Sequence, residues 1–520
     1  MMRPAFCAVT ALVSLALLVG STAATRDGVA AARGSAATRH LLIVLDGLRP
    51  DYVTPRLMPT LHALGRRGVV FERHHAVYPT VTRVNASSMA TGAYPGTHGL
   101  LGNTVFFPKV DPRRFLETQD RANLLKIEAS GDRLLTTTSI GETLQTVGKR
   151  LLVVSAGSTG ASYLLNNKVS GGAIIQVAYT LPAALHAKVV AAVGEADAEH
   201  MSSAEKNRRA VDAFLKVGLP EVDPAVTVLW FTDPDTVAHV SGIGHPDTVV
   251  ALSRLDGELK RLLDGLSRAG VLGTFDIWVT SDHGFSTHTG PPDLAAILRP
   301  FSGVLADGTP RIVASEGAIY VRDHDAATIE RIVGQLQRTE GVGAIFTPAS
   351  APGSFDGRVA GTLSFEAVRW SHERAGDLLF SPDWTDRPNS YGYKGTSASY
   401  GTAGHGSSSP FDVHNVLIAT GPDLRSGVRV ATPSGNVDFA PTFLRLLDVA
   451  IPPSMEGRVL EEALLAGART TGSVRHERHT ARVADGSYTL SADYSLVGAG
   501  GQTYRYLDST TVRRKRSTAP

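Results

Sequence analysis

Three almost uninterrupted apolar runs, each followed by acidic residues, constrain the fold of this 520-residue chain more than any other feature. The runs are residues 40–45 before Asp46, residues 226–231 before Asp233 and Asp235, and residues 277–280 before Asp282 and His283. A run without polar alternation is typical of a strand buried on both faces of a parallel sheet. Because ligands bind beyond the carboxyl ends of such strands, the acidic residues are candidate site residues.

Amphipathic helical patterns lie between these strands. Two capping boxes, in which a Ser and a Glu three residues later satisfy each other's backbone donors, predict helix starts. The boxes are Ser139 with Glu142 and Ser202 with Glu205. A longer helix should begin at Pro246 and carry apolar residues three and four positions apart up to Leu266. Further strands are expected at residues 151–154 and 416–419. This alternation predicts an α/β sandwich with a central, mostly parallel sheet between helices.

The composition of the sequence changes twice after the third apolar run. Residues 285–400 are rich in Gly, Pro and Ser and include a strand pattern at 317–322, so we expect a cap insertion there. Alternating patterns at residues 487–490 and 504–507 predict a small β appendage before a basic, solvated tail. The predicted segments are a catalytic domain at residues 39–466, which contains the cap, and the appendage with its tail at residues 467–520.

The first residues have the pattern of an export signal. Residues 5–20 are apolar and small residues follow at 21–24, which predicts a signal peptide at 1–24 and a flexible leader at 25–38. The apolar run is short for a membrane span, although an uncleaved anchor is the alternative. We therefore expect a secreted or periplasmic protein without a membrane span in the mature chain. The single cysteine, Cys7, lies in the signal, which excludes intrachain disulfides and thiolate metal sites.

The charge of the chain is nearly balanced. Lys and Arg total 51 against 49 Asp and Glu, which gives a formal net charge of +2. No strong field therefore favours nucleic acid or an anionic membrane as the main partner, and no nucleic-acid groove is implied. Hydrophobic residues make up 43% of the chain, which is typical of a globular protein with a large core. The sequence leaves the oligomeric state open.

Carboxylates and imidazoles accompany the predicted strand ends. The six candidate ligands are Asp46, Asp235, His239, Asp282, His283 and His405. Asp235 and His239 share one face if that turn is helical, and the glycines that flank His405 leave its backbone free to turn. Any one of these acidic residues alone could instead cap a helix. Mixed Asp/His ligation suits Zn²⁺, whereas Mg²⁺ prefers oxygen ligands, so six ligands predict two zinc ions roughly 4 Å apart.

Thr82 is the candidate nucleophile. It precedes a helical stretch that ends at Gly92, and Thr is a common helix cap. The start of a helix also offers a positive dipole and free N–H groups to an anionic phosphoryl group. A metal at that position would lower the pKa of the hydroxyl and make it a nucleophile.

Seven blocks of the sequence, in order over residues 40–460, resemble the alkaline phosphatase superfamily and, within it, the type I phosphodiesterase/nucleotide pyrophosphatase family. The blocks are residues 45–51, residues 79–82 with Asn85, residues 91–99, Gly102 with Asn103, residues 235–239, residues 281–284 and residues 404–406. The resemblance implies an alkaline-phosphatase-like sandwich. It also implies an enzyme that hydrolyses small phosphorylated substrates, either phosphate diesters or nucleotide pyrophosphates, through a covalent phosphothreonine.

The resemblance further implies a role for each candidate residue. One zinc ion would be held by Asp235, His239 and His405. The other would be held by Asp46, Asp282 and His283, with Thr82 completing it. The amide of Asn103 would support a non-bridging phosphate oxygen, whereas without the resemblance Asn103 is equally well a turn residue.

Related activities separate only in part. A sulfatase needs Cys or Ser in a Cys/Ser-x-Pro-x-Arg block, but residues 82–86 begin with Thr and contain no Pro. Thr82 and Asn103 also argue against a true alkaline phosphatase, which normally uses Ser and a phosphate-clamping Arg. A phosphonoacetate-type phosphonate hydrolase or another phosphomonoesterase of the superfamily remains an alternative. A catalytically silent metal- or ligand-binding protein is the alternative of another class, against which the intact site residues argue.

Three residues are candidate substrate contacts: Arg83, Asn103 and Phe106. Close nucleotide pyrophosphatases usually carry an aromatic residue after the nucleophile, where this chain has Arg83. A cation there favours a substrate with additional negative charge, unless Arg83 is a solvated surface residue. Phe106 and the adjacent Phe107 are placed to stack a base or an aryl group, or to pack in the core.

Overall fold

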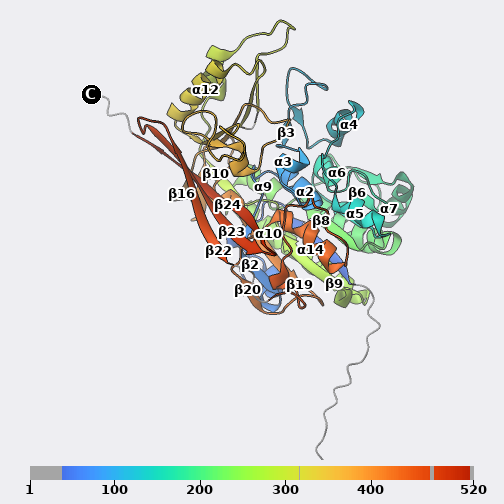
Figure 1. Cartoon of the computed structure of the whole chain (residues 1–520). Helices are drawn as coiled ribbons and strands as arrows, with labels where there is room; N and C mark the ends of the chain where they lie inside the picture. The colour runs from blue at the N-terminus through green and yellow to red at the C-terminus, as the bar shows by residue number, and fades with distance from the viewer. Residues whose placement is uncertain (1–37, 316, 469–472, 516–520) are drawn as a thin grey trace, which may run out of the picture. The chain divides into compact units, whose positions relative to one another are not determined.

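The computed structural model describes residues 38–315, 317–468 and 473–515 (Figure 1). The predicted signal peptide at 1–24 with Cys7, the leader up to residue 37, and the end of the basic tail lie outside these residues. Among the described residues, no helix combines the length and the apolar character needed to cross a membrane.

A ten-stranded mixed sheet forms the centre of the fold, in the order β20-β2-β19-β9-β1-β8-β5-β6-β7, with β21 paired to β2. Its parallel centre consists of β1 (Arg39–Leu45), β8 (Val226–Phe231), β9 (Phe275–Thr280), β5 (Leu151–Ser155) and β6 (Ala173–Gln176). The flanking strands are β7 (Tyr179–Leu181), β19 (His414–Thr420), β2 (Val69–His75), β20 (Val428–Val430) and β21 (Ser434–Gly435). The predicted central sheet is confirmed, and β19 runs antiparallel to β9 and β2.

Helices cover both faces of this sheet, which explains why its central strands carry no polar alternation. Leu42 and Val44 of β1 belong to one core and Leu41 and Ile43 to the other, as the two-residue period of a strand requires. The helices of the first core include α2 (Thr82–Thr91), α4 (Arg121–Ala129), α5 (Ile140–Thr146), α6 (Thr159–Leu165) and α14 (Phe439–Leu446). Those of the second include α1 (Pro59–Arg67), α7 (His186–Val193), α8 (Ser203–Ala213) and α10 (Pro246–Arg268).

Both predicted capping boxes are present. Ser139 and Ser202 each accept a hydrogen bond from the backbone of the Glu three residues on, and each Glu side chain accepts one from the backbone of its Ser, so that α5 and α8 begin where the sequence indicates. The second helix continues as a π-helical segment (Phe214–Val222), which extends past the predicted end near Gly218. Pro220, which has no N–H to donate, lies inside this segment and marks its irregularity.

The segment predicted to be a cap contains most of two further sheets. One has the order β11-β12-β15-β13-β14 and packs against α12 (Ala326–Arg338). Its strands are β11 (Ile312–Ser315), β12 (Ala318–Val321), β15 (Leu378–Pro382), β13 (Val342–Thr347) and β14 (Leu363–Ser364). The other has the order β16-β17-β10-β18, with β16 (Trp384–Pro388), β17 (Lys394–Ser397), β10 (Ser286–His288) and β18 (Ala403–Gly404).

The last strands form a three-stranded antiparallel sheet, drawn in red in Figure 1. It consists of β22 (Val474–Arg482), β23 (Tyr488–Ala499) and β24 (Gln502–Arg514). Leu490 and Tyr494 of β23 share a hydrophobic core with the cap sheet, so this C-terminal sheet packs on the cap. Arg513 and Arg514, which the sequence places in a solvated tail, are the last residues of β24. The Arg514 guanidinium donates to the carbonyl of Gln337 at 2.9 Å.

Candidate active site

The carboxyl ends of β1, β8 and β9 meet at one edge of the main sheet, and the predicted ligands gather there. Asp46 directly follows β1, and Asp282 follows β9 by two residues. Asp235 is the first residue of α9 (Asp235–Ser241), which also carries His239 one turn later. His405 arrives from the segment that follows β18, far along the chain.

Asp46, Asp282 and His283 form a buried cluster. One ligand atom from each lies within 4.8 Å of the others. His283 Nε2 is 3.1 Å from Asp282 Oδ2 and 3.7 Å from Asp46 Oδ1. Trp230 Nε1 donates to the other oxygen of Asp46 at 2.9 Å, and the backbone N–H of Gly47 donates to the other oxygen of Asp282 at 3.1 Å. The two inward oxygens have no hydrogen-bond partner among the described residues.

Asp235, His239 and His405 form a second, more open cluster, again with ligand atoms within 4.8 Å of one another. Asp235 Oδ1 is 3.2 Å from His239 Nε2 and 3.4 Å from His405 Nε2. The side chain of His239 is 42% exposed, whereas that of His283 in the first cluster is 0% exposed. The second cluster is therefore the one that solvent and ligands reach.

All three histidines are oriented in the same way. In each, Nδ1 lies 2.9 Å from a backbone carbonyl: that of Gly284 for His283, Ala403 for His239 and Thr80 for His405. A carbonyl can only accept, so Nδ1 carries a proton in each ring and Nε2 faces the cluster, the orientation that metal-binding histidines require. The rings of His283 and His405 stack with centroids 3.4 Å apart, which makes the two clusters neighbours.

The electrostatics of the clusters favour bound cations. Burial, together with the charges of Asp282 and Asp235, raises the pKa of Asp46 well above its ordinary value. Burial also opposes ionisation of Asp235, but its contacts with His239 and His405 outweigh that effect and lower its pKa. Three buried carboxylate oxygens without donors among the described residues converge with three imidazole Nε2 atoms, a set that matches the ligand chemistry of divalent metal ions. The residues present therefore fit the metal ions that the resemblance implies.

Thr82 lies beside the buried cluster. It is the first residue of α2, and Val81, not Thr82, occupies the cap position. The helix therefore does not use the Thr82 hydroxyl, whose Oγ1 lies 3.3 Å from His283 Nε2. Asn85 holds the preceding loop, since its side chain accepts from the Val77 N–H at 2.7 Å and donates to the Val77 carbonyl at 3.0 Å.

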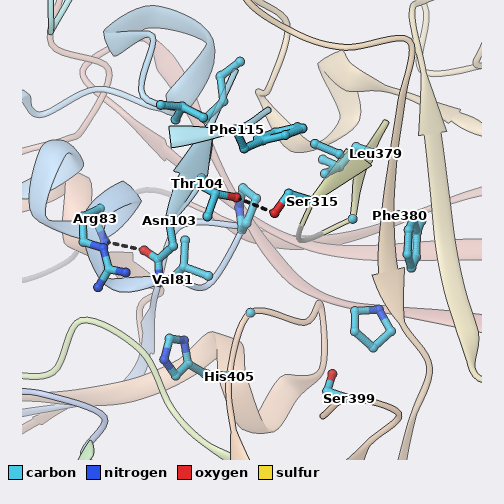
Figure 2. A pocket seen from close by; sticks show the side chains of 18 of the residues that line it. Val81, Arg83, Asn103, Thr104, Phe115, Ser315, Leu379, Phe380, Ser399 and His405 are labelled. Carbon is cyan, nitrogen blue, oxygen red and sulfur yellow. Dashed lines mark hydrogen bonds between the residues drawn. The ribbon is translucent and has the colours of Figure 1, made fainter. Parts of the chain in front are cut away.

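A cavity of about 600 Å³ opens beside Thr82 and the second cluster. The three predicted substrate contacts, Arg83, Asn103 and Phe106, all line it. Asn103 Oδ1 accepts from the backbone N–H of Arg83 at 3.1 Å, a bond drawn in Figure 2. Phe106 is only 6% exposed and packs against Tyr320 and Phe115, so it is both a wall of the cavity and part of an aromatic cluster.

Sequence reasoning missed several residues of the site. Trp230, which supports Asp46, lies inside an apolar strand and has no motif to mark it. Phe115, Tyr320, Leu379 and Phe380 also line the cavity, the last three from strands of the cap. Figure 2 shows Phe115 and Leu379 on the side of the cavity away from His405. Long-range pairing of the cap strands brings Tyr320, Leu379 and Phe380 to the site.

Comparison with known proteins gives consistent results. The family model for type I phosphodiesterase/nucleotide pyrophosphatase matches residues 40–406. Human ectonucleotide pyrophosphatase/phosphodiesterase family member 1 is 24% identical over 247 residues, 47% of this chain and 23% of the human protein. The venom phosphodiesterase of Macrovipera lebetinus is 24% identical over 247 residues, 47% of this chain and 25% of the venom protein. The chain thus spans about a quarter of the length of these curated relatives.

A solved structure shares the fold. It is an inactive variant of murine ectonucleotide pyrophosphatase/phosphodiesterase 5 in complex with AMP, with a TM-score of 0.56 and 17% sequence identity. The match covers 80% of this chain and 96% of the murine one. The alkaline-phosphatase-like fold predicted from the sequence is therefore confirmed. On the family match over residues 40–406, the chain belongs to the type I phosphodiesterase/nucleotide pyrophosphatase family of hydrolases.

Proposed function

We propose that this chain is a zinc-dependent hydrolase of phosphate diesters and nucleotide pyrophosphates that works through a covalent phosphothreonine on Thr82. One observation carries the proposal. The Thr82 hydroxyl, unused by its helix, lies 3.3 Å from His283 Nε2 and beside buried carboxylate oxygens that have no donor among the described residues. Membership of a hydrolase family supports the same interpretation.

The proposed cofactors are two Zn²⁺ ions, one in each cluster. Asp46, Asp282 and His283 would hold one, with Thr82 beside it, and Asp235, His239 and His405 would hold the other. When bound, such ions lower the pKa of a nearby hydroxyl and neutralise charge on a phosphoryl group during its transfer. Mixed oxygen and imidazole donors favour Zn²⁺ over Mg²⁺.

The proposed reaction has two steps, in which residues of the chain have distinct roles. Thr82 loses its proton and its oxygen attacks phosphorus in line, while the bond to the leaving-group oxygen breaks. The N-terminus of α2 and the Asn103 amide, oriented by its bond from the Arg83 N–H, favour the negative charge on the phosphoryl oxygens. Water then attacks the phosphothreonine from the side of the exposed His239 and releases Thr82.

The cavity suits a substrate with an aromatic or nucleobase group. Phe106, Phe115 and Tyr320 offer ring faces and edges along one wall, with ring centroids 5.0 to 5.8 Å apart. Asn103 places the phosphoryl group at the near end of the same cavity. AMP in the murine relative is a ligand of this general class.

A second candidate function rests on Arg83, which lines the cavity directly after the nucleophile. A cation there favours a substrate with additional negative charge, which is a monoester, a phosphonocarboxylate such as phosphonoacetate, or a polyphosphate. The ranking of kcat/KM over an aryl diester, an aryl monoester, a dinucleotide polyphosphate and phosphonoacetate decides between the two. Arg83→Ala should lower kcat/KM most for the substrate with the highest charge.

The decisive experiment for the reaction is replacement of Thr82. Thr82→Ala should reduce turnover by at least roughly 1,000-fold, since removing a nucleophile costs most of the chemical step. Thr82→Ser, the matched control, should retain much of it. Acid quenching during turnover, followed by mass spectrometry, should show a phosphate on Thr82 in the wild-type chain. Unchanged turnover in a Thr82→Ala variant that still binds its metal ions would contradict the proposal.

We also propose that residues 1–24 are a cleaved signal peptide and that the chain works outside the cytoplasm. The domain assignment, residues 39–466 with a cap at 285–400 and an appendage from 467, is part of the same proposal. N-terminal sequencing of the exported protein tests the first, with a start near residue 25 expected. Limited proteolysis tests the second and should separate the appendage from the catalytic domain before any cut within the core.

A further inference from the structure

A third group of potential metal ligands lies outside the two catalytic clusters. It consists of His75, His414 and Asp508, and one ligand atom from each lies within 4.8 Å of the others. His75 ends β2 and His414 begins β19, where the two residues are direct cross-strand partners. Asp508 belongs to β24 of the C-terminal sheet. The group therefore joins the main sheet to the C-terminal sheet.

The two imidazoles are held as the catalytic ones are. His75 Nδ1 lies 2.9 Å from the carbonyl of Ser434, and the ring of His414 is hydrogen-bonded to the backbone of His74. One nitrogen of each ring is thus fixed by the backbone, which leaves the other for the group. The two ring centroids are 4.6 Å apart.

The contact between His75 and Asp508 needs a positive charge between its atoms. With its proton on Nδ1, His75 presents the Nε2 lone pair to Asp508 Oδ1 at 2.9 Å, so that two acceptors face each other. Either a second proton on the ring or a metal ion resolves this conflict. Metal binding would also engage His414, whereas a simple ion pair between His75 and Asp508 would not.

The backbone of β24 is deformed at Asp508. Asp493 of β23 pairs with Ser509 and Tyr494 pairs with Leu507, so Asp508 is the extra residue of a β-bulge. Bulges redirect side chains, and this one brings the carboxylate to His75. The hydroxyl of Ser495 lies 2.9 Å from both carboxylate oxygens and fixes their orientation.

Other titratable and charged groups also lie against the site, among them Arg73 and Tyr506, whose ring stacks on that of His75 with centroids 5.4 Å apart. His476 Nδ1 is 3.9 Å from Asp508 Oδ2, and its Nε2 is 3.2 Å from the Arg73 guanidinium, but its side chain is 60% exposed. Burial and the neighbouring His75 lower the pKa of His414.

We propose that His75, His414 and Asp508 bind a zinc ion that fastens the C-terminal sheet to the edge of the main sheet. Two imidazole nitrogens and one carboxylate oxygen form a donor set that suits Zn²⁺, with water in the remaining position. Access is open, because the Asp508 side chain is 22% exposed. The ion would cross-link strands far apart in the chain, since His75 and Asp508 are separated by 433 residues.

The number of zinc ions bound per chain tests the proposal. Metal-free protein is equilibrated with buffered Zn²⁺ alone, and bound zinc is measured by mass spectrometry of the metal. The wild-type chain should bind one ion more than His414→Gln and one more than Asp508→Asn. In both variants the affinity for the third zinc ion should fall by more than roughly 100-fold. This loss is larger than that caused by removing a residue that only hydrogen-bonds to a metal ligand. His476→Ala, the matched control, should bind as many ions as the wild type.

Hydrogen exchange provides a second readout that does not depend on counting. Zinc should slow amide exchange in β24 of the wild-type chain and of His476→Ala, but not of His414→Gln. Circular dichroism of each variant shows whether it is folded, so the test of the third site does not depend on the proposed hydrolytic function. Equal zinc counts in wild type and both variants would overturn the third site. A His75–Asp508 ion pair without a metal ion would also overturn the third site. In that case Asp508→Asn would speed amide exchange in β24 equally with and without zinc, and His414→Gln would behave as the wild type.

Discussion

The two candidate metal clusters use similar side chains in different surroundings. Asp46, Asp282 and His283 are buried, with the Thr82 hydroxyl beside them. Asp235 and His239 lie on a helix that lines the cavity, and His239 is 42% exposed. The difference indicates a division of labour. In the proposed mechanism, the buried cluster is suited to hold one ion permanently beside Thr82, and the open cluster is suited to exchange water and leaving groups.

Metal removal should give the largest effect and should separate the clusters in time. A chelator is expected to abolish hydrolysis completely, and Zn²⁺ to restore it. Because the second cluster is exposed and the first is not, a metal ion bound at His239 should leave first. Activity toward substrates with poor leaving groups should then disappear before activity toward 4-nitrophenyl esters. Stopped-flow assays of both substrate types after addition of chelator measure the two phases.

Full activity in a chelator with no metal bound would contradict the assignment of both clusters. A single phase, shared by both substrate types, would instead contradict the difference in exposure as the basis of metal exchange.

Single ligand replacements sharpen the same comparison. Asp282→Asn removes the charge that the buried cluster offers its ion, so activation of Thr82 should fail and kcat should drop by roughly 1,000-fold for every substrate. His239→Ala or His405→Ala should cost roughly 10-fold for a good leaving group and about 100-fold or more for a poor one, because charge on the departing oxygen is no longer stabilised. The slope of log kcat against leaving-group pKa measures the difference.

The matched control for these variants is His245→Ala, since His245 lies outside both clusters at the N-terminus of α10. It should keep the wild-type slope. A His405→Ala variant with a normal rate on a poor leaving group would show that the second cluster does not act on the departing oxygen.

Much of this comparison could be predicted from the sequence, and its limits have a physical cause. Asp46, Asp235 and Asp282 follow strands of a buried parallel sheet, a pattern that local sequence contains in full. The exposure of the ligands depends instead on long-range packing. The carbonyl partner of His405 is that of Thr80, 325 positions away, and the partner of His239 is that of Ala403, 164 positions away. The bulge at Asp508 and the cap residues of the cavity have no local pattern either.

Trp230 supports the buried cluster through a hydrogen bond to Asp46. Its indole donates to the outer oxygen of Asp46 at 2.9 Å and so leaves the inner oxygen for the ion. Trp230→Phe keeps a ring in the core but deletes the donor, and zinc affinity or activity should fall roughly 10- to 100-fold. Trp278→Phe is the matched control, because Trp278 is equally buried on the strand β9 of the same sheet. Similar losses in both variants would point to packing alone.

The smallest expected effect is on the stability of the metal-free chain, where the clusters should respond to pH with opposite signs. The pKa of Asp46 is raised by burial and by Asp282, so its contribution to stability is present in acid and lost as the pH rises above about 4. The pKa of Asp235 is lowered by its two histidines despite burial, so its contribution is present above about pH 4 and lost in stronger acid.

Asp46→Asn should therefore stabilise the metal-free chain at pH 7, and Asp235→Asn should destabilise it, each by about 1 kcal/mol or more. Urea unfolding in chelator at about pH 4.5 and pH 7 measures both, with the Asp46→Asn gain expected to shrink at the lower pH. A gain independent of pH would mean that the new amide simply packs better than the carboxyl group and that carboxylate repulsion is not the cause.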